Sequence, residues 1–247
     1  MSELSGKMNK SLKDRIISLK ERIVTRTTIA ILRPFNRHRM VDFDHVKLDP
    51  DNPVVFLGNH AEIYGPIASA LCFPVPVRFW VISKMMFKKK DVRAYLYENT
   101  FSKKTYLPVF VRKLLAWYLG WLSVNVMNAL RAIAVYRDSP MKLRQTLRES
   151  VEALEQGENL MIFPEHPEGK YVKGGISELS PGFVMLAEAW WKKTGKKMRM
   201  MPVFANREKR TFTFGEEIVY EPENGYAAEQ ERILEAAYQQ LTALSER

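Results

Sequence analysis

The chain has 247 residues, of which 46% are hydrophobic and 27% charged, and these values exclude a disordered, collagen-like or low-complexity protein. Its single cysteine excludes an intramolecular disulfide, and no Cys/His cluster has the spacing of a zinc site. The formal net charge of +10 indicates an anionic partner, which could be nucleic acid, anionic lipid or a phosphorylated substrate.

The positive charge is concentrated at the start of the chain, where residues 1–40 hold ten Lys and Arg against three Asp and Glu. Apolar residues recur there at three- and four-residue spacing, namely Leu12, Ile16, Leu19 and Ile23. This pattern predicts a basic amphipathic helix, which Pro34 should end. Such a helix either packs on its own domain or binds an anionic membrane surface, and we expect residues 1–40 to form a membrane-associating segment.

The location of the protein is predicted from its apolar stretches. Charges interrupt the apolar positions of the first segment at nearly every turn, unlike the continuous apolar run of a secretory signal. The most apolar stretch, residues 114–136, is broken by polar side chains and by Arg131, so no transmembrane span is predicted. We therefore expect a cytoplasmic protein that attaches peripherally to the inner face of the cell membrane.

Residues 41–247 alternate short apolar runs with helical patterns. This alternation predicts one α/β domain with a mixed, largely parallel central sheet flanked by helices. The predicted strands, in chain order, are 54–57, 78–82, 132–136, 160–163, 200–204, 211–214 and 217–220. A helix is expected shortly after residue 60, and further helices are predicted at 142–156, 184–193 and 227–244.

The end of the strand at 54–57 carries the first candidate site. Asn59 and His60 follow this strand directly, and strand ends are where α/β sheets present ligand sites. A histidine there can act as a general base toward a hydroxyl, because its unperturbed pKa lies near neutral pH. A lone histidine that caps a loop fits the same pattern.

Two further strand ends carry polar side chains. Phe163, Pro164 and Glu165 end the strand at 160–163 and precede a loop rich in Gly, Lys and Glu. Arg137 ends the segment IAVYR, where its guanidinium could bind a phosphate. In isolation, the first segment also fits an ordinary polar turn and the second an ordinary surface arginine.

Taken in order, these segments resemble the sequence blocks of the glycerolipid acyltransferase superfamily, which includes the bacterial 1-acylglycerol-3-phosphate acyltransferases. That family has an N-H-x-x-x-x-D block, an Arg-containing block, an F-P-E-G-T-R-S block and a strand block with proline. The resemblance covers residues 50 to 220 or so. The counterparts here are Asn59-His60, IAVYR with Arg137, IFPE with Pro164 and Glu165, and MMPVFA with Pro202.

The resemblance implies an acyltransferase of phospholipid biosynthesis. A fatty acyl group would pass from acyl-CoA or acyl carrier protein to the hydroxyl of a lysophospholipid such as 1-acylglycerol-3-phosphate. The family pattern implies that His60 deprotonates this hydroxyl and that Asn59, Arg137, Pro164 and Glu165 bind the acceptor. No metal ion or tightly held cofactor is implied.

The sequence departs from the family pattern in two blocks. Gly65 stands where the family has the Asp that orients the histidine, and Glu62 is the nearest acid, so we expect Glu62 to orient His60. In the third block the basic residue comes later, as Lys170, which we expect to bind the substrate.

Two alternatives to an active acyltransferase remain. The first is a catalytically inactive protein of the same fold that binds lipid or membrane, because the family's Asp is missing. The second is a nucleic-acid binder. It fits poorly, since the basic residues lie in an amphipathic pattern with aliphatic residues and no nucleic-acid motif is visible.

Overall fold

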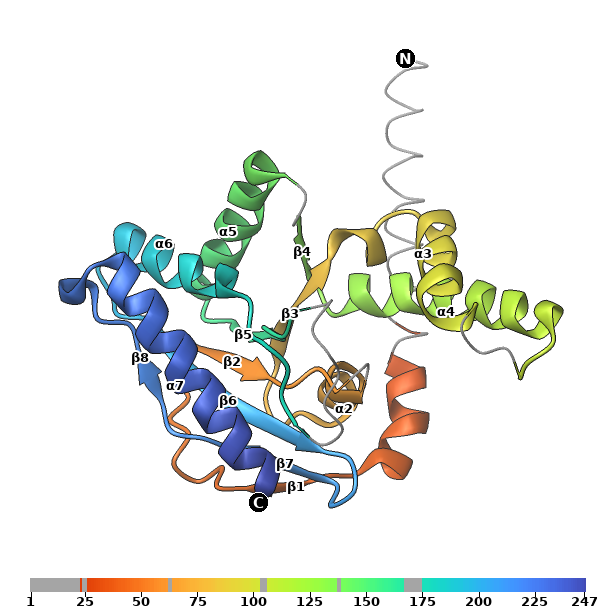
Figure 1. The fold of residues 1–247 in the computed structure, drawn as a ribbon, viewed down its shortest axis with the longest axis horizontal. Helices are drawn as coiled ribbons and strands as arrows, with labels where there is room; N and C mark the ends of the chain where they lie inside the picture. Colours follow the sequence, from red (N-terminus) through yellow and green to blue (C-terminus); the bar gives the residue numbers. More distant parts are fainter. Residues whose placement is uncertain (1–22, 24–25, 62–63, 103–105, 137–138, 167–174) are drawn as a thin grey trace, which may run out of the picture. The chain divides into compact units, whose positions relative to one another are not determined.

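The computed structural model describes all residues except 1–22, 24–25, 62–63, 103–105, 137–138 and 167–174 (Figure 1). The chain divides into two compact units. The smaller unit comprises Met1–Leu32 and Val81–Arg137, and the larger comprises Arg33–Trp80 and Asp138–Arg247.

The described residues form an α/β fold with a mixed, largely parallel eight-stranded sheet, which confirms the predicted fold class. The sheet order is β1-β7-β6-β2-β5-β3-β4, and β8 pairs with β6. Strands β2, β3, β5 and β6 run parallel, whereas β7 and β8 run antiparallel to β6. The strands are β1 (Arg39–Val41), β2 (Val54–Gly58), β3 (Val77–Ile82), β4 (Ile133–Val135), β5 (Asn159–Ile162), β6 (Arg199–Asn206), β7 (Thr211–Phe214) and β8 (Ile218–Val219).

The helices are divided between the two units. Those of the larger unit are α2 (Tyr64–Cys72), α5 (Pro140–Glu155), α6 (Val184–Thr194) and α7 (Tyr226–Glu246). The smaller unit contains α3 (Lys89–Leu96), which continues into the π-helical turn η3 (Tyr97–Phe101), α4 (Val109–Ala129) and a helical stretch at residues 26–32. Short 3-10 turns are η1 (Arg33–Asn36), η2 (Ser83–Met85), η4 (Pro181–Phe183) and η5 (Pro222–Asn224). Over the part of the chain that is described, no helix combines the length and the hydropathy that membrane crossing requires.

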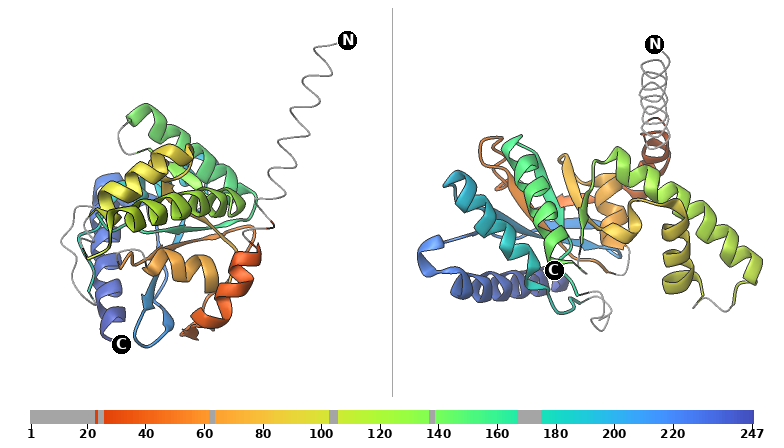
Figure 2. Two further views of the ribbon diagram at one scale, coloured as in Figure 1. Left: turned by 90° about the vertical axis from the view of Figure 1, so that its right-hand side faces the viewer. Right: turned by 90° about the horizontal axis from the view of Figure 1, so that it is seen from above.

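The core of the larger unit is built on both faces of the sheet. Every residue of β2 is buried, as are the six central residues of β6, so both faces of these strands must be covered. Helices α2 and α7 both pack on β6, and they lie on opposite sides of the sheet (Figure 2). On one face the rings of Phe56, Phe73, Phe212 and Phe214 form an aromatic cluster. Burial of each ring stabilises the fold by about 2 kcal/mol.

All seven predicted strands are present, each with its bounds within two residues of the prediction. Strand β1 was not predicted, because its three residues lie in a basic stretch without alternation of apolar and polar side chains. Strand β1 crosses residue 40, where the sequence predicts the boundary between the membrane-associating segment and the α/β domain. Residues 26–32 are helical, and the α-helix gives way to the turn η1 at Arg33, next to Pro34.

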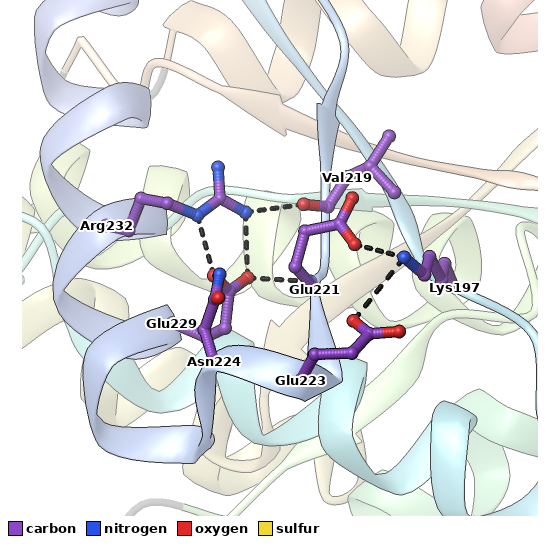
Figure 3. Close-up of polar contacts among 7 residues, drawn as sticks. All are labelled: Lys197, Val219, Glu221, Glu223, Asn224, Glu229 and Arg232. Atoms are coloured by element: carbon purple, nitrogen blue, oxygen red, sulfur yellow. Dashed lines mark hydrogen bonds and ion pairs between the residues drawn. The ribbon is translucent and has the colours of Figure 1, made fainter.

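A buried carboxylate holds the start of α7 (Figure 3). Glu229 accepts hydrogen bonds from the Glu221 backbone N–H at 2.8 Å, from Asn224 Nδ2 at 2.8 Å and from Arg232 Nε and Nη2, each at 2.7 Å. Burial raises the pKa of Glu229, but these donors outweigh burial and lower the pKa from its ordinary value of 4.5 to about 2. The ionised carboxylate therefore stabilises the folded state.

Replacing Glu229 by Gln should lower the free energy of unfolding at neutral pH by about 2 kcal/mol, since the amide cannot accept from all these donors. Because the pKa is lowered in the folded state, the contribution of Glu229 is complete above its ordinary pKa of 4.5 and is lost as the pH falls toward 2. Urea unfolding should show that the free energy of unfolding of the wild type falls toward that of the Glu229→Gln variant as the pH is lowered from 4.5 toward 2. Glu231→Gln, an exposed site on the same helix, is the control. A difference in the free energy of unfolding between wild type and Glu229→Gln that stays the same as the pH falls would contradict the stabilising role of the ionised carboxylate.

Candidate functional site

The carboxyl ends of β2, β5 and β6 meet at one edge of the sheet in the larger unit. Leu57 of β2 pairs with Ile162 of β5 and with Pro202 of β6, so the residues that follow β2 and β5 emerge side by side. Of the predicted site residues, this edge brings together Asn59, His60, Pro164 and Glu165. The other three, Glu62, Arg137 and Lys170, lie outside the described residues.

Asn59 extends the sheet beyond the last residue of β2. Its buried side chain accepts a hydrogen bond from the Ala205 backbone N–H at 2.7 Å and donates to the Ala205 carbonyl at 3.3 Å. The side-chain amide thus takes the place of one more backbone pair between β2 and β6. Both ends of the amide are used in this way, so Asn59 fixes where the chain leaves the sheet just before His60.

Glu165 connects the end of β5 to the end of β2. Its carboxylate Oε1 accepts from the His60 backbone N–H at 2.5 Å, and its Oε2 accepts from the Ser177 hydroxyl at 2.8 Å and the Ser177 N–H at 3.4 Å. The carboxylate is buried, and a buried charge needs such donors to offset its desolvation. Glu165 therefore ties three separate segments of the chain around His60.

The His60 ring lies beside two stacked aromatic rings. The ring centroids of His60 and Phe163 are 5.9 Å apart in an edge-to-face arrangement, and Phe163 stacks on Phe79 at 6.3 Å. Gly58 leaves the space for Phe163, because a Cβ at Gly58 would come within 2.8 Å of Phe163 Cε1. One side of the histidine is consequently apolar.

The chain turns tightly after His60. The Tyr64 N–H donates to the Ala61 carbonyl at 3.1 Å, and the Gly65 N–H donates to the His60 carbonyl at 3.2 Å. Ala61 has a φ of 41°, a left-handed conformation that strains a non-glycine residue. A Cβ on Gly65 would lie 1.9 Å from the Asn59 carbonyl oxygen. The turn thus requires glycine at the position where the acyltransferase pattern has an aspartate.

The loop that follows Glu165 is anchored at both of its ends. The His166 N–H donates to the Glu178 carbonyl at 2.7 Å, and the Ser180 N–H donates to the Pro164 carbonyl at 2.7 Å. These bonds flank an antiparallel bridge between Glu165 and Leu179. The chain therefore leaves and returns to the sheet edge next to the bonds that hold His60.

A second group of side chains lies at the same edge, and we call His38, Tyr64, Arg207 and Arg210 the Tyr64 cluster. His38 precedes β1, and both arginines lie in the turn between β6 and β7. His38 Nδ1 is 2.5 Å from the Asn36 carbonyl oxygen, and its Nε2 is 2.6 Å from the Tyr64 hydroxyl. A carbonyl can only accept, so Nδ1 donates to Asn36. Burial lowers the pKa of His38 and so favours the neutral ring, in which Nε2 accepts from the Tyr64 hydroxyl.

Two arginines contribute positive charge near Tyr64. The Arg207 guanidinium lies 5.9 Å from the centroid of the Tyr64 ring. Burial raises the pKa of Tyr64, and the charges of Arg210 and Arg207 oppose this shift. Burial also lowers the pKa of His38, and the charge of Arg210 lowers it further, against the raising effect of the bond to Asn36. Arg207 and Arg210 therefore give this part of the sheet edge positive charge.

Sequence reasoning missed the Tyr64 cluster. His38 lies in the segment 1–40 that the sequence assigns to the membrane, and no motif in the sequence gives Tyr64 a role. The signal that could have found the cluster is the basic turn Arg207–Arg210, which directly follows the predicted strand at 200–204. A turn after a strand of the parallel set lies at the ligand-binding edge of an α/β sheet.

An open hollow of about 790 Å³ lies between α7 and residues 178–179. Its lining includes three glutamates, Glu178, Glu231 and Glu235, together with Arg232, which already pairs with Glu229. This lining is unfavourable for an anionic ligand. Across the described ranges, no three His, Cys, Asp or Glu side chains gather as ligands for a metal ion.

Comparison of the chain with protein-family models and with curated proteins finds no match. The resemblance to the acyltransferases therefore rests on the sequence blocks alone.

Proposed function

We propose that this protein is an acyltransferase that moves a fatty acyl group from acyl-CoA or acyl carrier protein to the hydroxyl of a lysophospholipid. The observation that supports this proposal most is the pair of bonds around His60. Asn59 fixes the backbone before the histidine to β6, and Glu165 binds the histidine's own N–H. Such support holds a general base in place, which catalysis requires.

In the proposed reaction, a ring nitrogen of His60 takes the proton of the acceptor hydroxyl while the hydroxyl oxygen attacks the thioester carbonyl carbon. The carbon–sulfur bond then breaks, and the imidazolium returns the proton to the leaving thiolate. Glu62 remains the residue proposed to orient His60. Asn59 and Glu165 act through the His60 backbone, so we assign them as positioning residues.

The phosphate of the acceptor has two proposed sets of ligands. Arg137 and Lys170 are proposed from the family resemblance. The Tyr64 cluster adds Arg207 and Arg210, which lie in the turn after β6 at the same sheet edge as His60, with the Arg207 guanidinium 5.9 Å from the centroid of the Tyr64 ring. Arginine suits this task because its planar guanidinium donates two parallel hydrogen bonds to a phosphate.

The proposal is tested by transfer of a labelled acyl group from acyl-CoA and from acyl carrier protein to a panel of lysophospholipids. His60→Ala should lower turnover about a thousandfold, since the general base is lost. His45→Ala is the matched control, because His45 is exposed and bonds only the Gly215 carbonyl among the contacts described. If no acceptor is labelled by the wild type, while the protein still binds lipid, the inactive lipid-binding alternative replaces the enzyme.

A further inference from the structure

Helix α4 of the smaller unit exposes a strip of large apolar side chains. The strip consists of Phe110, Leu114, Trp117 and Tyr118, which are 71%, 62%, 52% and 50% exposed. Their spacing of four, three and one residues places them along one side of the helix. Apolar patches of this kind on a folded protein mark a site of interaction.

Most of the strip lies outside the surface that α4 uses to pack on α3. The α3–α4 contact includes Gly120, which is buried, as is Ala116 one turn before it. A Cβ at Gly120 would lie 2.6 Å from Arg93 Cγ, so α3 crosses α4 closely there. The Arg93 guanidinium also lies 4.9 Å from the centroid of the Trp117 ring. Trp117 therefore touches α3 at one border of the strip, whereas Phe110 and Leu114 stay 71% and 62% exposed and are left for another partner.

The charge of the protein is divided between its two units. The residues of the smaller unit carry a net charge of +13, whereas those of the larger unit carry −3. Within residues 81–136 there are ten Lys and Arg against two Asp and Glu. Among the exposed ones, Lys88 and Lys90 lie at the start of α3, and Lys113 lies within the strip. The exposed apolar strip thus belongs to the strongly basic unit.

We infer that the α4 strip docks on the surface of an anionic phospholipid bilayer. Trp and Tyr favour the boundary between headgroups and acyl chains, and Lys side chains reach from that depth to lipid phosphates. The charge also argues against a second copy of the chain as the occupant, since two units of +13 would repel each other. The helix would lie in the plane of the bilayer and not cross it.

This site differs from the segment at residues 1–40 that the sequence assigns to the membrane. The choice of a lipid partner rests on the proposed function, but lipid binding is measured without catalysis. The experiment is sedimentation of the full chain with vesicles of phosphatidylcholine alone and of phosphatidylcholine and phosphatidylglycerol in equal parts.

Replacing both Phe110 and Leu114 by Ser should weaken binding to the mixed vesicles about a hundredfold, or tenfold for each side chain. Replacing Lys88 and Lys90 by Gln should reduce the preference for phosphatidylglycerol about fivefold per lysine. The control replaces Met141 and Tyr238 by Ser, because both are exposed apolar residues of the larger unit. Circular dichroism and the unfolding midpoint confirm that each variant is folded.

Unchanged vesicle binding of the folded Phe110/Leu114 variant would overturn the inference. If sedimentation velocity shows a dimer for the wild type and a monomer for the Phe110/Leu114 variant, while vesicle binding is unchanged, the strip binds a second copy of the chain and not a bilayer. Acyl transfer to a lysophospholipid below its micellar concentration separates this inference from the proposed function. The Phe110/Leu114 variant should keep that activity if only membrane docking is lost. A wild type that transfers no acyl group but still binds vesicles would contradict the proposed acyltransferase function and leave the docking inference standing.

Discussion

Replacing Gly65 by Ala should lower the free energy of unfolding by about 3 kcal/mol, the upper part of the range for overpacked sites. The added Cβ would lie 1.9 Å from the Asn59 carbonyl oxygen and 3.3 Å from the His60 carbonyl oxygen. Backbone atoms cannot rotate away as the end of a side chain can. The turn from His60 to Gly65 must therefore open, and its hydrogen bond between the Gly65 N–H and the His60 carbonyl must lengthen or break.

The same geometry predicts the result of restoring the family's aspartate. Gly65→Asp should destabilise the protein at least as much as Gly65→Ala and should lower acyl transfer, because the displaced Asn59 carbonyl directly precedes His60. Urea unfolding measures the first effect and the transfer assay the second. Gly182→Ala is the matched control, since among the described residues other than its chain neighbours only Ser180 Oγ, at 3.9 Å, would lie within 4 Å of the added Cβ. Higher activity of Gly65→Asp would show that the turn rearranges and that the missing carboxylate limits catalysis.

Gly65 shows why the site could be predicted only in part. From the sequence alone, a glycine in place of the aspartate indicates a lost catalytic group, and the inactive alternative follows from it. The steric conflict between a Cβ at position 65 and the Asn59 carbonyl oxygen gives a second reason for glycine. The spacing of residues along the sequence cannot show this conflict. Whether Glu62 orients His60 remains a prediction.

More of the fold than of the site could be predicted from the sequence. Strands such as 54–57 and 200–204 are continuous apolar runs between turn signals, a pattern that local sequence carries. The contact between Asn59 and Ala205, by contrast, joins residues 146 positions apart. Spacing cannot predict such a contact, because it arises only when β2 and β6 pair. The Tyr64 cluster likewise gathers residues from before β1, from α2 and from the β6–β7 turn.

Replacing Glu165 by Gln should reduce kcat about a hundredfold and lower the free energy of unfolding by about 2 kcal/mol. The carboxylate accepts from the His60 N–H on one oxygen and from Ser177 on the other. A glutamine has one carbonyl oxygen, so its NH₂ group would face a donor on one of the two sides. The His60 backbone or the Ser177 segment must then move.

A positioning role for Glu165 makes a distinct kinetic prediction. The KM for the acyl donor should stay unchanged while kcat falls, because the substitution displaces the base without removing a donor-binding group. Assays run well below the unfolding midpoint separate this effect from loss of folded protein. Glu178→Gln is the control, since it makes the same chemical change at an exposed carboxylate next to Leu179, the residue that forms the isolated bridge with Glu165. A Glu165→Gln variant with wild-type kcat would mean that the His60 backbone is held by other contacts, and the positioning role would be withdrawn.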